Sequence, residues 1–223
     1  MPDGQYSFYL HSDDRTDIAA MATISTISQP LRGEFIRTAA TAAAVVYQVD
    51  ARLPALIPVF FAGQLSAVRL CAVMALVSGT WSSLTGLPDE PENGEAALPV
   101  SPETEYQRRR YTLTLQNGRS GERVESVLTE ASSRLRGDLL RNLIITGLAL
   151  HTTAPELPRL LASMPVPPTS VSELQALVQQ MAGTADVNRA AAAVPDTPAA
   201  SAAPVSGSDT RELKKNMRRA FGD

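Results

Sequence analysis

The stretch that decides the fold is Arg108–His151, RRRYTLTLQNGRSGERVESVLTEASSRLRGDLLRNLIITGLALH. It begins with three arginines, and residues 111–115 then alternate between polar and apolar types as a β-strand does. Residues 117–118, Asn-Gly, predict a turn. Apolar residues recur at helical spacing over 124–131 and again over 140–148. The stretch therefore predicts a strand followed by two helices.

The N-terminal part of the chain repeats this pattern. Tyr6 aligns with Tyr111 and Leu10 with Leu115 at an offset of 105, and the offset becomes 104 after one residue is dropped in the turn. The further matches are Leu31-Arg32-Gly33 with Leu135-Arg136-Gly137, Glu34 with Asp138, Arg37 with Arg141, Leu53-Pro54 with Leu157-Pro158, Leu56 with Leu160, and Gly79 with Gly183. A shared pattern over about 75 residues indicates an internal repeat. Because a lone strand leaves both edges unpaired, we expect strands 6–10 and 111–115 to form one antiparallel ribbon.

The sequence divides into two repeats, two linkers and a tail. We predict a first repeat with its helical cap at 1–79, an acidic proline-rich linker at 80–107, a second capped repeat at 108–183, a disordered linker at 184–208 and an amphipathic partner-binding segment at 209–223. Within the first repeat we predict a strand at 5–11, a helix at 14–27 capped by Asp13 with Ile18, Met21 and Ile24 inward, a helix at 32–48, and further helices at 53–61 and 65–78.

Charge is distributed unevenly along the chain. The formal net charge of −3 alone argues against a nucleic-acid binder. Residues 106–151, however, hold eight basic and four acidic side chains, and residues 209–223 hold five and three. Residues 80–105 hold six acidic side chains and no basic ones. The basic charge is thus concentrated on the second repeat and the tail, which keeps nucleic-acid binding open.

Several function classes find no support in the sequence. Cys71 is the single cysteine and lies in an apolar run, which predicts a buried core thiol and a reducing, cytoplasmic location. The polar, acidic N-terminus is unlike a signal peptide, and the apolar run from Leu70 is too short to span a membrane. His11 and His151 have no partners at metal-ligand spacing. We expect no enzyme activity, no cofactor, no metal and no membrane partner.

The strand of the second repeat is the candidate DNA-reading element. If Leu113 and Leu115 face the helices, then Arg110, Thr112 and Thr114 face outward. A two-stranded ribbon fits the major groove of DNA, where such side chains reach base edges. The alternative is an edge strand blunted by arginines, which explains three in a row less well. We favour DNA binding.

Two further features are open to two interpretations each. The helix starts at Arg32-Gly33-Glu34 and Arg136-Gly137-Asp138 could hold phosphate groups through unpaired backbone N–H groups, or could be simple helix caps. The segment 209–223 could dock in a partner's groove by folding on binding, or could be a solvated, frayed terminus. Binding of this segment to a membrane surface is a minor alternative.

The sequence resembles the ParR family, also called StbB, of centromere-binding adaptors in plasmid segregation. The residues that carry the resemblance are Arg109-Arg110-Tyr111-Thr112-Leu113-Thr114-Leu115, Arg136-Gly137-Asp138-Leu139-Leu140-Arg141-Asn142, Thr146-Gly147-Leu148-Ala149-Leu150, Pro155, Leu157-Pro158, and in the tail Ser208-Asp209 to Lys214-Lys215-Asn216-Met217. The resemblance covers 108–183 well and 1–79 more loosely. It implies a mainly α fold of tandem ribbon-helix-helix repeats that share a two-stranded antiparallel ribbon, with additional capping helices.

The resemblance also implies roles for individual residues. The expected DNA contacts are Arg108, Arg109, Arg110, Thr112, Thr114, Arg136 and Gly137, with Ser7, Tyr9, Arg32 and Gly33 in the first repeat. The expected contacts with an actin-like ParM filament are Leu213, Lys214, Lys215, Met217, Arg218 and Phe221. The family pattern further implies self-association on the centromere repeats of double-stranded DNA.

This chain departs from the family pattern because it carries two copies, so that one chain could supply both strands. The first strand lacks the basic flank of the second, so either the ribbon reads an asymmetric site or the first repeat has become a dimerisation scaffold. We predict a non-enzymatic partition adaptor, with repression of its own operon as a second role. The alternatives are an accessory protein of a conjugative relaxosome and an antitoxin or interaction scaffold.

Overall fold

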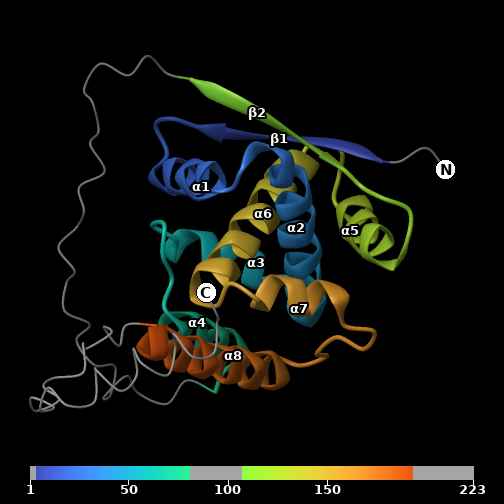
Figure 1. Cartoon of the computed structure of the whole chain (residues 1–223). Helices are drawn as coiled ribbons and strands as arrows, with labels where there is room; N and C mark the ends of the chain where they lie inside the picture. The colour runs from blue at the N-terminus through green and yellow to red at the C-terminus, as the bar shows by residue number, and fades with distance from the viewer. Residues whose placement is uncertain (1–3, 81–106, 193–223) are drawn as a thin grey trace, which may run out of the picture. The chain divides into compact units, whose positions relative to one another are not determined.

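The computed structural model describes residues 4–80 and 107–192, and it is mainly helical with one two-stranded antiparallel sheet (Figure 1). Contacts group the described residues up to Asp186 into one compact unit. The first repeat contributes β1 (Gln5–His11), α1 (Arg15–Thr26), the 3-10 turn η1 (Gln29–Leu31), α2 (Arg32–Val49), α3 (Leu53–Leu56), the 3-10 turn η2 (Ile57–Phe60) and α4 (Ala67–Ser78). The second contributes β2 (Arg108–Thr114), α5 (Arg119–Glu130), α6 (Arg136–Thr153), α7 (Leu157–Ser163) and α8 (Val171–Ala192).

The two strands pair with each other in the antiparallel sense, which confirms the pairing expected from the repeat. Gln5 lies opposite Thr114, Ser7 opposite Thr112, and His11 opposite Arg108. β2 begins three residues earlier than the sequence predicts, so the three arginines belong to the strand. The reason is the length of β1, which offers pairing partners as far as His11.

One face of this ribbon packs against the hydrophobic core. Phe8, Leu10, Leu113 and Leu115 are buried on it, and the Phe8 ring stacks on Tyr111 with the ring centroids 5.3 Å apart. The period of two residues per strand places these side chains on the same side. Below them, buried side chains from both repeats form a single core. Neither repeat therefore has a core of its own.

The two repeats exchange contacts reciprocally. α6 of the second repeat packs against β1 and α1 of the first, and α2 of the first packs against β2 and α5 of the second. The same exchange holds between α3 and α6 and between α7 and α2. α2 and α6 cross beneath the ribbon, and the helices drawn in Figure 1 lie on one side of the two strands. The opposite face of the ribbon is left uncovered by the described helices.

Small residues permit the close crossing of α2 and α6. The α2 face toward the core is built of alanines, and Ala39, Ala40 and Ala43 are fully or almost fully buried. On α6, a Cβ added to Gly147 would lie 2.3 Å from the carbonyl oxygen of Ala39, inside any allowed contact distance. Only glycine fits at this position of α6.

The first helix differs from the sequence prediction in its cap and its buried face. α1 is capped by Asp14, not Asp13, because the Asp14 carboxylate accepts a hydrogen bond from the Asp17 N–H at 2.9 Å. Ile18 and Met21, expected to face inward, are only partly buried. The buried residues of α1 are Asp17, Ala19, Ala20 and Ile24. Asp17 therefore occupies the inward position that the apolar pattern predicted for Ile18.

The helical caps also differ in detail. The helix predicted at 53–61 is divided into α3 and η2, because Pro58 lacks the N–H that would continue the α-helical bonding. Gly79 ends α4 in the left-handed conformation with φ of 71°, whereas its sequence match Gly183 lies inside α8. α8 continues to Ala192, past the end predicted for the second repeat, along an alanine-rich stretch of high helix propensity.

Cys71 lies in the core, as the sequence predicts. Burial raises the pKa of its thiol, and a hydrogen bond with the Gln179 side chain acts in the opposite direction. The thiol is therefore kept protonated and unreactive at neutral pH. In the described ranges, 4–80 and 107–192, none of the helices has the length and apolar character needed to cross a membrane.

Candidate nucleic-acid interface

The uncovered face of the ribbon gathers six of the side chains that the sequence singles out. Alternation along each strand places Ser7 and Tyr9 of β1 beside Arg108, Arg110, Thr112 and Thr114 of β2. Gln5 belongs to the same face, opposite Thr114. The four β2 residues are exposed, and Ser7 and Tyr9 are partly exposed. We call this set of seven residues the outer face.

Cross-strand contacts orient the two arginines of the outer face. Arg110 donates from Nε and Nη2 to the Ser7 hydroxyl oxygen at 3.2 and 2.9 Å. The Arg108 guanidinium lies over the Tyr9 ring, 3.8 Å from its centroid, in a cation–π contact. A guanidinium carries five N–H donors, so Arg110 keeps three of them for another acceptor. Both arginines are held against side chains of the opposite strand and still have hydrogen-bonding capacity.

Arg109 lies on the other face of the ribbon. It is opposite Leu10 in the register, and its guanidinium lies 5.3 Å from the centroid of the Tyr111 ring. Burial raises the pKa of the Tyr111 phenol, and the nearby cations Arg109 and Arg32 act in the opposite direction. The run of three arginines is thus divided, with two on the outer face and one on the helical side. The two-residue period of a β-strand already predicts that Arg109 faces away from Arg108 and Arg110. Treating the three arginines as one basic cluster overlooks this.

Arg32 and Arg136 lie at the starts of α2 and α6, and both are engaged with the preceding helix. Arg32 donates from Nε to the Ile27 carbonyl at 2.8 Å, and Arg136 donates from Nε to the Ala131 carbonyl at 3.2 Å. Ile27 and Ala131 are the C-terminal caps of α1 and α5. Each arginine therefore fixes the turn between the two helices of its repeat, at equivalent positions.

The same helix starts lack side-chain caps. The residues before them, Leu31 and Leu135, make no side-chain capping hydrogen bond. Gly33 and Gly137 follow in the first turn of each helix, and a Cβ on Gly137 would lie 3.9 Å from the Ser7 carbonyl oxygen. The start of α6 therefore adjoins the middle of β1. The N–H groups of Arg32 and Arg136 donate to the backbone carbonyls of Gln29 and Ser132. The N–H groups that follow them lie at the positive ends of the helix dipoles.

A buried ion pair joins the repeats, and sequence reasoning missed it. Asp17 of α1 is fully buried and accepts hydrogen bonds from Arg141 Nε at 2.7 Å and from the His11 N–H at 2.8 Å. Burial raises the pKa of the Asp17 carboxyl, and the bonds from His11 and Arg141 offset part of that rise. At an offset of 104, Asp17 matches Gly121. The signal available in the sequence was this difference between the repeats, a carboxylate in the first and a glycine in the second.

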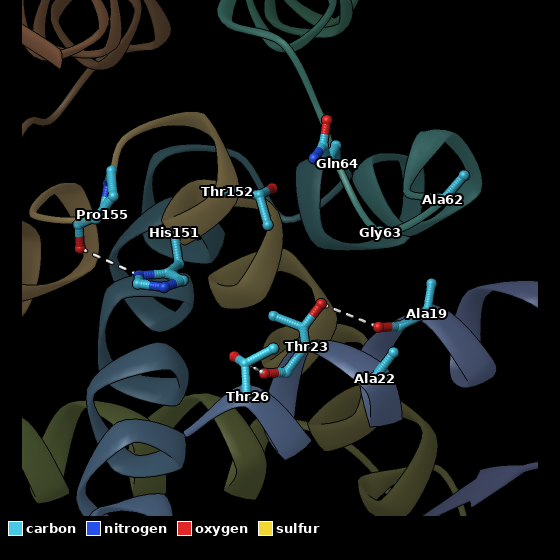
Figure 2. Close-up of a pocket in the computed structure, with 10 residues that line it drawn as sticks. All are labelled: Ala19, Ala22, Thr23, Thr26, Ala62, Gly63, Gln64, His151, Thr152 and Pro155. Carbon is cyan, nitrogen blue, oxygen red and sulfur yellow. Dashed lines mark hydrogen bonds between the residues drawn. The ribbon is translucent and has the colours of Figure 1, made fainter. Parts of the chain in front are cut away.

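The structure also contains a cavity of about 410 Å³, which lies between α1, the end of α6 and residues 62–64 (Figure 2). Its lining is mostly small side chains, and the hydroxyls of Thr23 and Thr26 already donate to carbonyls of their own helix. His151 Nδ1 lies 3.2 Å from the Pro155 carbonyl oxygen, and the His151 ring meets Phe35 edge-on. These contacts give His151 a packing role at the end of α6.

Several sequence predictions lie outside the described residues. Of the linker predicted at 80–107, residues 81–106 lie outside the description. Of the disordered linker predicted at 184–208, residues 184–192 are instead helical in α8, and the remainder lies outside. The tail residues that lie outside are Leu213, Lys214, Lys215, Met217, Arg218 and Phe221.

The family comparison matches the chain twice. A family model described as plasmid stability protein matches residues 4–74 and again 109–178. The chain belongs to the plasmid stability protein family. The two matched segments begin at β1 and β2 and end in α4 and α8, so the family pattern coincides with the repeats predicted from the sequence. Searches of curated proteins and of solved structures found no match.

Proposed function

We propose that this plasmid stability protein is a sequence-specific DNA-binding adaptor of a plasmid partition system, built as tandem ribbon-helix-helix repeats. The architecture is supported by the order strand, helix, helix in each repeat and by the reciprocal packing of α6 on β1 and α2 on β2. In this plan the two strands form one ribbon, and the second helix of each unit supports the strand of the other.

The observation that carries the proposal is the outer face. It is polar, exposed and uncovered by the described helices, and it presents Arg108, Arg110, Thr112 and Thr114 from one strand. A two-stranded ribbon fits the major groove, where arginine and threonine reach base edges. Blunting of a sheet edge explains these arginines less well, because Arg108 and Arg110 project from the face of the ribbon and are oriented by Tyr9 and Ser7.

The starts of α2 and α6 offer contacts to the DNA backbone that do not depend on the base sequence. The N–H groups that follow Arg32 and Arg136 in the first turns of α2 and α6 can donate hydrogen bonds to a DNA phosphate, with Gly33 and Gly137 allowing close approach. Arg32 and Arg136 use part of their guanidinium donors on the preceding helix, and the remaining donors are available to the same phosphates. Phosphate contacts of this kind fix register and orientation on the duplex.

The partition role rests on the family and on the tail. Membership of the plasmid stability family supports a role in plasmid maintenance. On the resemblance to the ParR adaptors, Leu213, Lys214, Lys215, Met217, Arg218 and Phe221 bind the actin-like filament. Copies of the chain associate side by side on the centromere repeats. Binding beside its own gene would also repress the operon.

The test measures binding of the full chain to a duplex from beside its own gene, by fluorescence anisotropy, with a scrambled duplex for comparison. Arg110→Ala combined with Thr112→Ala should weaken specific binding by about 1–3 kcal/mol per lost base contact. Arg159→Ala removes an exposed arginine of α7 on the helical side and should leave discrimination intact. Unchanged discrimination in the double variant would remove the outer face from the proposal. Absence of binding by the wild type at moderate salt would favour an antitoxin or interaction scaffold.

A further inference from the structure

The backbone pairing of the two strands is pseudo-twofold symmetric. An offset of 105 converts the pair Gln5 and Thr114 into the pair Arg110 and Tyr9, and both are pairs of the observed register. The centre of this exchange is the pair Ser7 and Thr112. If the two strands had the same sequence, the two ends of the outer face would therefore be chemically identical.

The two ends are in fact different. The end at Tyr9 and His11 carries Arg108 and Arg110 on the outer face. The end at Gln5 and Thr114 carries an amide and a hydroxyl. The residue equivalent to Arg110 is Gln5, which is exposed at the opposite end. One end of the outer face is therefore cationic and the other end is neutral.

Contacts across the ribbon fix the positions of the two arginines of the outer face. Arg110 is bonded to Ser7 at the centre of the ribbon, and Arg108 is stacked on Tyr9. These contacts hold the Arg108 guanidinium at the Tyr9 end and the Arg110 guanidinium beside the central pair, so neither is placed at the Gln5 end. Arg109 does not supplement them, because it faces the helices beside Tyr111.

The chemistry of the two ends selects different bases. Arginine forms paired hydrogen bonds with O6 and N7 of guanine, and glutamine forms them with N6 and N7 of adenine. We infer that the DNA site of this chain is not palindromic, with guanine in the half that contacts Arg108 and Arg110 and adenine in the half that contacts Gln5. This inference rests on the proposed DNA-binding function and specifies the site that the outer face reads. Each bound molecule then has one orientation on the duplex.

The experiment selects bound duplexes from a random-sequence pool with the full chain and sequences them. The wild-type chain should enrich an asymmetric site with guanine in one half. Gln5→Arg should change the preference of the other half toward guanine and make the site more symmetric. Arg110→Gln should reduce the enrichment of guanine about tenfold. Arg109→Gln is the matched control, since it makes the same substitution one residue away on the helical face, and it should leave the base preference unchanged.

The outcomes separate the two proposals. A palindromic wild-type site, or a site that Gln5→Arg leaves unaltered while the variant keeps the wild-type circular dichroism spectrum, would overturn the inference and leave DNA binding in place. Loss of guanine preference in Arg109→Gln equal to that in Arg110→Gln would overturn the assignment of faces. A wild-type chain that enriches no sequence would overturn the proposed function together with the inference.

Discussion

Arg141 of α6 and Asp17 of α1 form a buried ion pair that joins the second repeat to the first, with Nε 2.7 Å from the carboxylate. The equivalent arginine, Arg37 of α2, pairs with Glu34 on its own helix, where the glutamate side chain is 64 % exposed. The two arginines occupy matching positions in the repeats. They nevertheless differ in the environment of their partners and in whether they connect the repeats.

The first prediction concerns this difference. Asp17→Ala should lower the free energy of unfolding by about 3 kcal/mol, because it leaves Arg141 and the His11 N–H without their buried acceptor. Glu34→Ala should cost about 1 kcal/mol or less, because its ion pair is exposed. Urea denaturation of the two variants measures both values. Equal losses would mean that the Asp17 contact contributes little to holding the repeats together.

The second prediction concerns the crossing of α2 and α6. Gly147→Ala should destabilise the chain by about 1–3 kcal/mol, because the new Cβ would lie 2.3 Å from the Ala39 carbonyl oxygen and the helices would have to separate. Gly183→Ala is the control, since nothing lies within 4 Å of a Cβ there. It should stabilise α8 by up to about 1 kcal/mol through helix propensity. Thermal unfolding of the two variants decides the point, and a neutral Gly147→Ala would contradict the close crossing.

The third prediction separates DNA binding from filament binding. Deletion of residues 209–223 should leave the affinity for DNA nearly unchanged, because the outer face and the helix starts remain. It should abolish co-sedimentation of the DNA complex with the actin-like filament. A large loss of DNA affinity, with a smaller dependence on salt, would instead assign the basic tail to the phosphate backbone.

The fourth prediction concerns assembly. Because β1 and β2 pair within one chain, the unfolding midpoint should not change over a hundredfold range of protein concentration. Denaturation at two concentrations and sedimentation velocity without DNA provide the measurement. A midpoint that rises with concentration would mean that the ribbon is formed between chains.

Much of the framework could be predicted from the sequence, because it depends on local periodicity. The alternation at Leu113 and Leu115, the helical spacing from Val124 onward and the match of Tyr6 to Tyr111 gave the elements and their pairing. The contacts between distant residues could not be predicted in this way. In the sequence Asp17 is a polar residue near a helix start, and nothing local connects it to Arg141, 124 residues away.

The candidate site was predicted only in part. Its residue types came from the basic strand, and alternation placed Thr112 and Thr114 correctly on one face. The second role of Arg32 and Arg136 as ties to the preceding helix depends on the turn geometry that places a carbonyl within reach of each guanidinium. That geometry follows from how both repeats pack, and no single segment contains it.

The joining of both strands in one chain has an evolutionary consequence. In a homodimer every substitution appears twice, once on each side of the symmetry axis, so a change that suits one side must also be tolerated on the other. Here Asp17 has Gly121 as its counterpart, and Gly121 lies so close to the Gln116 backbone that a Cβ would be 2.1 Å from its carbonyl oxygen. An aspartate could not be accepted at both positions. Covalent linkage has allowed the two halves to diverge, and each strand can acquire its own binding chemistry without altering the other.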